Sequence, residues 1–122
     1  MISVALAAYN GRRFIEVQVA SILAQLGATD ELVVADNGST DGTWEYLQGL
    51  ALADPRVKTF QNLTERGVIA NFGFALAHCQ GDIIFLADQD DRWYPNKVAL
   101  ICATFAQSPS ILLVQSDAEL ID

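Results

Sequence analysis

Basic residues are scarce in this sequence, and long apolar runs are absent. Of 122 residues, 7 are Lys or Arg and 15 are Asp or Glu, so the formal net charge is −8. Without a basic stripe the chain cannot neutralise a phosphate backbone, and we expect no nucleic-acid partner. A membrane-spanning helix needs roughly 20 consecutive apolar residues, and a signal peptide begins with a basic region. Neither pattern occurs, which favours a cytoplasmic protein.

Cysteine and histidine are equally scarce. Cys79 and Cys102 lie within apolar helical patterns, which favours two buried reduced thiols over a disulfide framework or a zinc site. The single histidine, His78, comes near the end of a predicted helix, where a structural or surface role is favoured over catalysis. One histidine gives no support for a Ser-His-Asp or Cys-His catalytic arrangement.

Apolar residues are abundant by contrast: they make up 52% of the chain, and charged residues 18%. This balance excludes a disordered chain, and the length fits one domain. So high an apolar share in a short chain has two explanations. Either the core is unusually complete, or another surface covers part of the fold.

Strands and helices are predicted to alternate along the whole chain. Apolar runs predict five strands, and apolar residues three or four apart predict four helices between them. The predicted strands are 2–8, 31–35, 57–61, 82–87 and 111–114. Three of the predicted helices are 12–26, 67–79 and 95–105. The fourth lies between the second and third strands; Asp41 caps it, and it carries Trp44, Leu47 and Leu50. The order βαβαβαβαβ predicts an α/β fold, with a mostly parallel sheet and helices on both faces.

Open sheets of this kind bind ligands beyond the carboxyl ends of their strands. That rule selects three loops, residues 9–11, 36–42 and 88–92. In the second, Asp36 or Asn37 can face a base or a ribose hydroxyl, although the same residues also suit a strand-to-helix turn. After the third loop, Trp93 and Tyr94 either cover the cleft or pack the start of the next helix.

The third loop carries three carboxylates in four positions, Asp88, Asp90 and Asp91. Such like charges repel one another unless a ligand compensates, and a hard divalent cation with a bound diphosphate would do so. The alternative is a solvated acidic turn in which Asp91 or Asn96 caps the next helix. An EF-hand loop and a P-loop are excluded because their required glycine, glutamate and lysine positions are not matched.

Five segments together resemble a known family across essentially the whole chain. They are ISVALAAYNG, SILAQ, DELVVADNGSTDGT, RGVIANFGFAL and GDIIFLADQDDRWYPNK. In order and spacing they resemble the N-terminal part of the family-two inverting glycosyltransferases, which have the GT-A fold. The DQDD-R-W loop and the V-I-A-N-F helix are most similar to the rhamnosyltransferase-like members, which build bacterial surface polysaccharides.

The resemblance implies transfer of a hexosyl or deoxyhexosyl group from a nucleotide-diphosphate sugar to an acceptor hydroxyl, with inversion. Asp90 would bind a divalent metal, Mn²⁺ or Mg²⁺, that bridges the diphosphate, and Asp88 would share the metal or contact the ribose. The acceptor would be a saccharide or a lipid-linked molecule, which allows a location at the inner face of the membrane.

The nucleotide would bind, by the same resemblance, against Ala7, Tyr9, Asp36, Asn37 and Asp88, with Tyr9 stacking near the base. Members of the family commonly have an acid where this chain has Asn37. An amide oxygen can still accept the N3–H of a pyrimidine, so a pyrimidine nucleotide is expected. On this basis an Asn37→Asp substitution is expected to preserve or tighten pyrimidine binding.

The family's catalytic base follows well after the acidic loop, so it is expected beyond Asp122, and Asp117 and Glu119 come too early. We therefore expect residues 1–122 to correspond to the nucleotide-sugar half of a GT-A domain, without its acceptor half. We expect this half to be inactive by itself and, with an uncovered apolar face, to self-associate as a homo-oligomer.

Two other functions compete with this interpretation. A non-catalytic nucleotide- or metal-binding module remains an alternative. A phosphotransferase with an aspartyl nucleophile is disfavoured, because Asp91 and Arg92 follow Asp90 where that motif requires a small residue, and because the motif normally follows the first strand.

Overall fold

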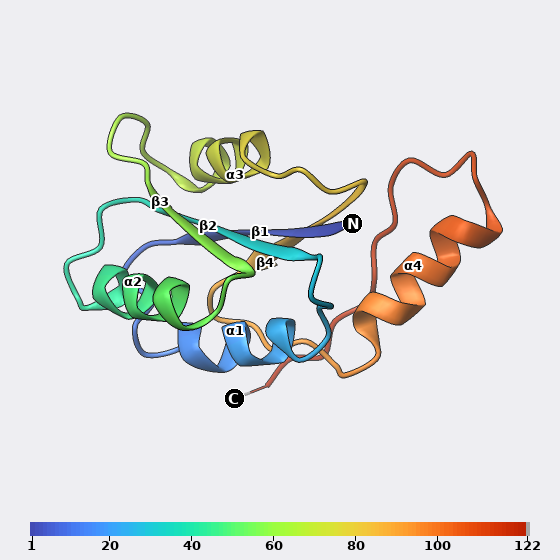
Figure 1. The fold of residues 1–122 in the computed structure, drawn as a ribbon, viewed down its shortest axis with the longest axis horizontal. Coiled ribbons are helices and arrows are strands. Elements are labelled where there is room, and N and C mark those ends of the chain that lie inside the picture. The colour runs from blue at the N-terminus through green and yellow to red at the C-terminus, as the bar shows by residue number, and fades with distance from the viewer. Residues whose placement is uncertain (122) are drawn as a thin grey trace.

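The computed structural model, which describes residues 1–121, contains one sheet of four parallel strands in the order β3-β2-β1-β4 (Figure 1). The strands are β1 Ile2–Ala8, β2 Glu31–Asp36, β3 Val57–Gln61 and β4 Ile83–Asp88. The helices are α1 Ile15–Leu23, α2 Thr43–Ala53, α3 Val68–Ala77 and α4 Lys97–Gln107. The predicted α/β class with a parallel sheet is confirmed.

Helices cover both faces of this sheet, as Figure 1 shows: α1 and α2 lie on one face and α3 lies on the other. The larger core packs α1 and α2 against β1 and β2, with Ile15, Val19 and Ile22 of α1 fully or almost fully buried. A smaller core packs Ala75 of α3 against Ala5 of β1 and neighbouring residues. Because β1 and β2 are covered on both sides, they appear in the sequence as continuous apolar runs.

The predicted fifth strand, residues 111–114, does not form. These residues run past the outer edge of β4 without pairing with it, and a groove of about 820 Å³ is lined by both. Leu112 and Leu113 are 93% and 84% exposed. Strand propensity reflects packing on a pleated surface more than a property of the backbone, and here these two side chains are not packed against other residues. Asp122 lies outside the described residues.

The first two helices begin later than the sequence pattern indicates. The carbonyl oxygen of Gly11 accepts the N–H groups of Phe14 and Ile15, so a turn precedes α1. The carboxylate of Asp41 accepts the N–H groups of Arg12 and Thr43. Asp41 therefore ties the loop before α2 to the loop after β1, and Gly42 occupies the N-cap position.

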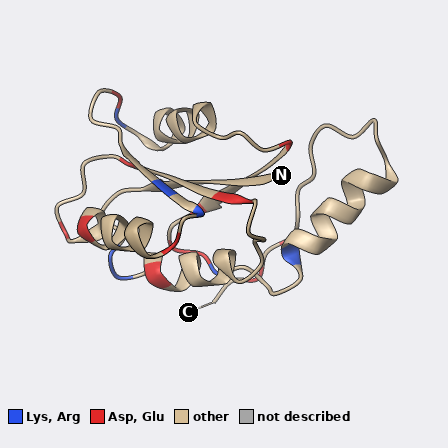
Figure 2. Cartoon of the chain, viewed as in Figure 1, with Lys and Arg blue, Asp and Glu red and all other residues tan. Residues whose placement is uncertain are grey.

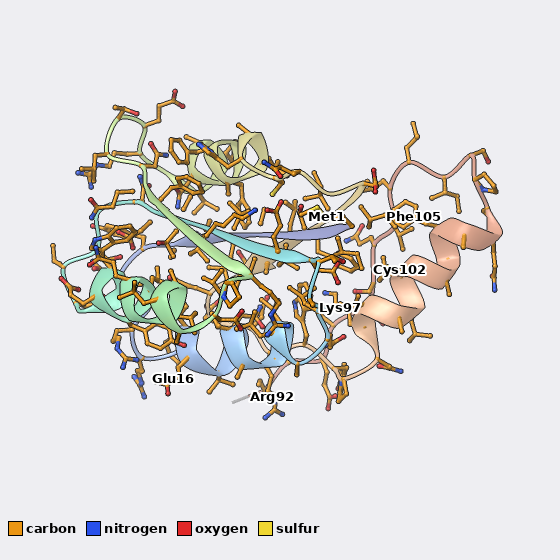
Figure 3. All side chains as sticks on the ribbon, viewed as in Figure 1. Met1, Glu16, Arg92, Lys97, Cys102 and Phe105 are labelled. Carbon is orange, nitrogen blue, oxygen red and sulfur yellow. The ribbon has the colours of Figure 1, made fainter. Side chains whose placement is uncertain are left out.

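Helix α4 lies beyond the β4 edge, and its labelled residues Cys102 and Phe105 are on the side that faces the sheet (Figure 3). Cys102 is partly buried against the larger core, and Cys79 against the smaller one. Both thiols are free, as expected. His78 is also structural in its contacts, because its ring stacks on Phe60 at 4.2 Å and its Nδ1 lies 2.8 Å from the carbonyl oxygen of Phe74.

The Lys and Arg positions, blue in Figure 2, are dispersed over several elements of the described chain and do not form a stripe. Within the described residues, every helix is too short or too polar to cross a bilayer.

A buried carboxylate anchors the amino-terminal edge of the sheet. Glu31, whose side chain is 1% exposed, accepts hydrogen bonds from Lys58 Nζ at 2.5 Å and from Ser3 Oγ and the Gln80 N–H at 2.6 Å each. Burial alone would raise the pKa of Glu31, but these hydrogen bonds outweigh it and the pKa is lowered. The ionised form of Glu31 therefore joins β1, β2, β3 and the loop after α3.

The fold should lose part of its stability in acid through Glu31. Because the pKa of Glu31 is lower in the folded state than in the unfolded state, ionised Glu31 contributes its full share of the unfolding free energy at neutral pH. This stabilisation is lost as the pH falls below about 4.5. Glu31→Gln should cost about 1–3 kcal/mol of unfolding free energy at pH 7 and flatten the acid dependence. Urea unfolding at pH 7 and pH 4 measures both effects. Glu45→Gln, on an exposed position of α2, is the control, and equal behaviour of the two variants would contradict the assignment.

Candidate functional site

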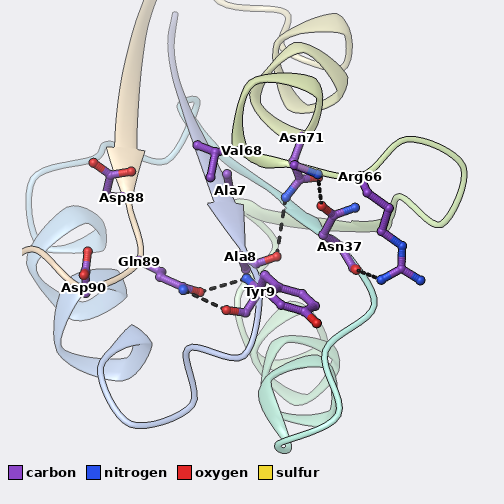
Figure 4. Close-up of a pocket in the computed structure, with 11 residues that line it drawn as sticks. Ala7, Ala8, Tyr9, Asn37, Arg66, Val68, Asn71, Asp88, Gln89 and Asp90 are labelled. Atoms are coloured by element: carbon purple, nitrogen blue, oxygen red, sulfur yellow. Dashed lines mark hydrogen bonds between the residues drawn. The ribbon is translucent and has the colours of Figure 1, made fainter.

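The three loops selected from the sequence meet at the carboxyl edge of the sheet. The register aligns Ala8 with Asp36 and Ala7 with Asp88, so β1, β2 and β4 end at the same level. Beyond them lies a pocket of about 450 Å³ (Figure 4). Its lining residues are Ala7, Ala8, Tyr9, Asn37, Arg66, Gly67, Val68, Asn71, Asp88, Gln89 and Asp90.

Two of the three loop carboxylates line this pocket, Asp88 and Asp90, and Asp91 does not. Partial burial raises the pKa of Asp88, and the negative charges of Asp91 and Asp90 raise it further. Within the described residues, no group of three or more His, Cys, Asp or Glu side chains forms a complete metal site. The acidic loop therefore contributes two carboxylates, those of Asp88 and Asp90, to the pocket wall.

Helix α1 and the turn after it hold the acidic loop and the start of α4 through three side chains, spaced three to four residues apart. Gln18, fully buried, donates from Nε2 to the carbonyl oxygen of Asp88 at 2.8 Å. Ser21 Oγ accepts the N–H of Trp93 at 3.0 Å. Gln25 donates to the carbonyl oxygen of Tyr94 at 2.8 Å and accepts the N–H of Val98 at 2.9 Å. These bonds fix the loop backbone and leave the carboxylates unoccupied.

The structure does not bring the side chain of Asp36 to the pocket. Asp36 is buried, and its carboxylate accepts the N–H groups of Gly38 and Ser39 at 3.1 and 2.9 Å and the hydroxyl of Ser39 at 2.6 Å. Asp36 therefore shapes its own loop.

Asn37 does line the pocket, but its amide is engaged by the protein. Nδ2 donates to the carbonyl oxygens of Asn62 and Glu65, both at 2.9 Å, and Oδ1 accepts the N–H of Gly67 at 3.0 Å. Both amide hydrogens are thus used, and one lone pair of Oδ1 is left for a ligand.

Sequence reasoning did not identify Asn62, Asn71 and Arg66. Asn71, nearly fully buried on α3, donates to the carbonyl oxygens of Ala35 at 2.8 Å and Ala8 at 3.4 Å. Arg66 Nη1 donates to the carbonyl oxygen of Asn37 at 3.2 Å, and the guanidinium lies on the pocket wall (Figure 4). The segment containing Arg66 and Asn71 contributed to the family resemblance, but its individual polar residues were assigned no role.

Aromatic residues on the two sides of the acidic loop have different surroundings. Tyr9, 51% exposed, lines the pocket at the end of β1. Trp93 is 7% exposed, its ring centre lies 5.5 Å from that of Phe85, and Nζ of Lys97 lies over the Trp93 ring, 4.6 Å from its centre. Trp93 therefore packs the start of α4 and does not cover the pocket beside Tyr9.

Comparison with known families matches residues 3–120 to glycosyl transferase family 2. The chain belongs to this family. The carboxyl-edge pocket, with Asp88 and Asp90 on its wall, is therefore a feature of a family 2 chain.

Two curated relatives illustrate the range of the family. An uncharacterized glycosyltransferase of Nostoc sp. is 33% identical over 99% of this chain and 37% of its own length. A UDP-Glc:alpha-D-GlcNAc-diphosphoundecaprenol beta-1,3-glucosyltransferase of Escherichia coli is 31% identical over 82% of this chain and 39% of its own length. This family 2 chain thus spans less than two fifths of the length of either relative.

Two solved structures share the fold of this family 2 chain. Residues 1–349 of S. aureus TarS, in complex with UDP-GlcNAc, superpose with a TM-score of 0.78 and 25% identity, over 87% of this chain and 31% of that TarS fragment. A Pyrobaculum calidifontis mannosyltransferase in complex with GDP-Man and Mn²⁺ has a TM-score of 0.78 and 27% identity, over 86% of this chain and 32% of the mannosyltransferase. Both likenesses support the GT-A-like fold expected from the sequence.

The amide contacts of Asn37 reverse the sequence-based expectation for Asn37→Asp. A carboxylate would place an oxygen, without hydrogens, against the carbonyl oxygens of Asn62 and Glu65. Asn37→Asp should lose about 1–3 kcal/mol of unfolding free energy and bind nucleotide more weakly, as measured by urea unfolding and calorimetry. Asn96→Asp is the control, because this exposed N-cap residue of α4 makes no side-chain cap hydrogen bond. Retained stability and nucleotide affinity in Asn37→Asp would contradict this expectation.

Proposed function

We propose that this family 2 protein binds a nucleotide-diphosphate sugar in the carboxyl-edge pocket and transfers the sugar to an acceptor hydroxyl with inversion. The observation that carries the proposal is the composition of one pocket. It has an exposed aromatic ring, Tyr9, and a cation, Arg66, on its wall together with the carboxylates of Asp88 and Asp90. A nucleoside diphosphate has the matching parts: a flat base, a polar sugar and a charged diphosphate.

Each lining residue has a role that its chemistry supports. The ring of Tyr9 stacks on the base, and Ala7 leaves space at the pocket wall because its side chain is small. Arg66 has guanidinium donors to spare beyond its bond to Asn37, so it can pair with a base carbonyl. Asp88, at the end of β4, accepts a hydrogen bond from a ribose hydroxyl or shares the metal with Asp90.

The pair Asp88 and Asp90 fits a divalent cation, Mn²⁺ or Mg²⁺. Both provide hard oxygen donors, and the pKa of Asp88 is raised by its burial and by neighbouring negative charge, which a bound cation would relieve. Such cations usually take one or two carboxylates and complete their shell with phosphate oxygens. When bound, the metal would stabilise the charge that develops on the leaving diphosphate.

We propose a pyrimidine nucleotide as the donor. Asn37 Oδ1 keeps one lone pair after accepting the Gly67 N–H, and it can accept the N3–H of uracil or thymine. The TarS structure holds UDP-GlcNAc and the P. calidifontis structure holds GDP-Man, so a comparison of UDP with GDP binding decides between the two classes of base.

For the sugar we propose a hexose or deoxyhexose, because the loop after β4 and helix α3 resemble those of rhamnosyltransferase-like members. For the acceptor we propose a saccharide or a lipid-linked molecule at the inner face of the membrane, in polysaccharide biosynthesis. The E. coli relative, which is named for a diphosphoundecaprenol acceptor, supports this class. NMR of the product's anomeric configuration tests the reaction: a retained configuration would contradict inversion.

Calorimetry with UDP, in Mn²⁺ and then in chelator, tests metal-dependent nucleotide binding. We expect UDP binding to require Mn²⁺, and Asp90→Ala should weaken it by more than about tenfold. Substitution of residues that only hydrogen-bond to a metal ligand already lowers metal affinity by about tenfold or more. UDP should bind more tightly than GDP, because the one free lone pair of Asn37 Oδ1 can accept one N–H, and we assign it to the N3–H of uracil.

Asp91→Asn is the matched control for this experiment. It removes a carboxylate from the same loop, but Asp91 does not line the pocket, so Mn²⁺-dependent binding should persist. Equal UDP binding with and without metal would contradict the roles of Asp88 and Asp90. Tighter binding of GDP would contradict the pyrimidine assignment.

A further inference from the structure

Gln89, the residue between Asp88 and Asp90, directs its side-chain amide to the backbone of Tyr9. Nε2 donates to the carbonyl oxygen of Tyr9 at 2.9 Å, and Oε1 accepts the N–H of Tyr9 at 2.9 Å. Figure 4 shows both bonds between the acidic loop and the loop after β1. One amide therefore satisfies both backbone polar groups of a residue 80 positions away in the sequence.

These two bonds extend the pairing of β1 with β4 beyond the last paired residues, Ala7 and Asp88. After Asp88 the chain enters a turn, so its backbone no longer runs beside β1. In a parallel ladder, the neighbouring backbone satisfies N–H and C=O groups. At Tyr9 the amide of Gln89 replaces that backbone, and it fixes the position of Tyr9 relative to the acidic loop.

Gly11 provides the space that this amide occupies. A Cβ at residue 11 would lie 2.1 Å from Oε1 and 2.3 Å from Cδ of Gln89. Gly11 is itself buried, and its N–H donates to Thr43 Oγ1 at 3.0 Å. The Gln89 amide is therefore held between the backbones of Tyr9 and Gly11, and a larger residue at position 11 would displace it.

The acidic loop is anchored separately on its other side. The carbonyl oxygen of Asp88 accepts Nε2 of Gln18, a fully buried residue of α1. Gln18 thus ties the loop to the helix layer, whereas Gln89 ties it to Tyr9. The two amides have separable effects: loss of the Gln89 contact leaves the Gln18 anchor in place.

We propose that Gln89 is a positioning residue that sets Tyr9 relative to Asp88 and Asp90. This inference rests on the proposed function, in which Tyr9 stacks on the base and the two carboxylates serve the diphosphate. Gln89 then couples the base side of the donor site to its diphosphate side. Its loss should weaken the binding of a nucleoside diphosphate more than the binding of a diphosphate without a base.

Gln89→Met tests this coupling, because methionine keeps the length of the side chain and removes both hydrogen bonds. With Mn²⁺ present, calorimetry should show about tenfold weaker UDP binding, as expected for two neutral hydrogen bonds. Inorganic pyrophosphate has no base to stack on Tyr9, so its affinity should change by less than about twofold. In a Tyr9→Ala background, Gln89→Met should likewise change UDP affinity by less than about twofold.

Gly11→Ala provides a second, independent variant. Its methyl group displaces the side-chain amide of Gln89, while residue 89 itself is not substituted. It should give a similar loss of UDP affinity, and adding Gln89→Met to it should cause little further loss. Gly49→Ala is the control: this glycine lies in α2 with nothing within 4 Å of an added Cβ, so both ligands should bind as before.

Equal losses of UDP and pyrophosphate affinity in Gln89→Met, or an undiminished loss in the Tyr9→Ala background, would overturn the inference, since Gln89 would then only shape the acidic loop. Unchanged UDP binding in Gln89→Met would also overturn it and would leave the proposed function intact. A wild-type protein that binds neither UDP nor GDP with Mn²⁺ would overturn the proposed function and this inference with it.

Discussion

Pairing of β1 on both of its edges is the constraint on which the candidate site depends. The register with β2 ends at Ala8 and Asp36, and the register with β4 ends at Ala7 and Asp88. A shift by one residue in either ladder would turn alternate side chains to the opposite face and would change the level of the following loop. The buried apolar residues of β1 oppose such a shift, so the same packing that stabilises the sheet also aligns the three loops.

Neutral amide side chains hydrogen-bond the loops that line the pocket and so fix them relative to the strand ends. Gln18 and Gln89 hold the acidic loop, and Asn37, Asn62 and Asn71 join the ends of β1, β2 and β3 to the start of α3. In the described residues, no buried side-chain nitrogen or oxygen lacks a hydrogen-bond partner. An amide can satisfy a backbone donor and acceptor together without adding charge. The ionised groups on the pocket wall therefore stay available for a ligand.

The sequence predicted the parts of this molecule that depend on apolar pattern. The bounds of β1 and β3 agree with the structure, and the three loops meet at one edge because parallel strands share a direction. It could not predict contacts between a side chain and a distant backbone, such as that between Gln89 and Tyr9, because no periodicity records them. It also placed a strand at 111–114, where the apolar pattern is present but Leu112 and Leu113 are exposed instead of packed. It could not show that the amide of Asn37 is already engaged.

The charges on the pocket wall explain why we propose a metal at this site. Asp88 and Asp90 contribute two negative charges and Arg66 one positive charge, so the wall carries a net charge of −1 in a chain whose formal charge is −8. A diphosphate entering such a pocket would be repelled, and partial burial strengthens the repulsion because it lowers the local dielectric constant. A divalent cation between the carboxylates would change the sign of the local charge. On this argument the metal would do more than assist the leaving group, since it would also be the condition for the nucleotide to bind.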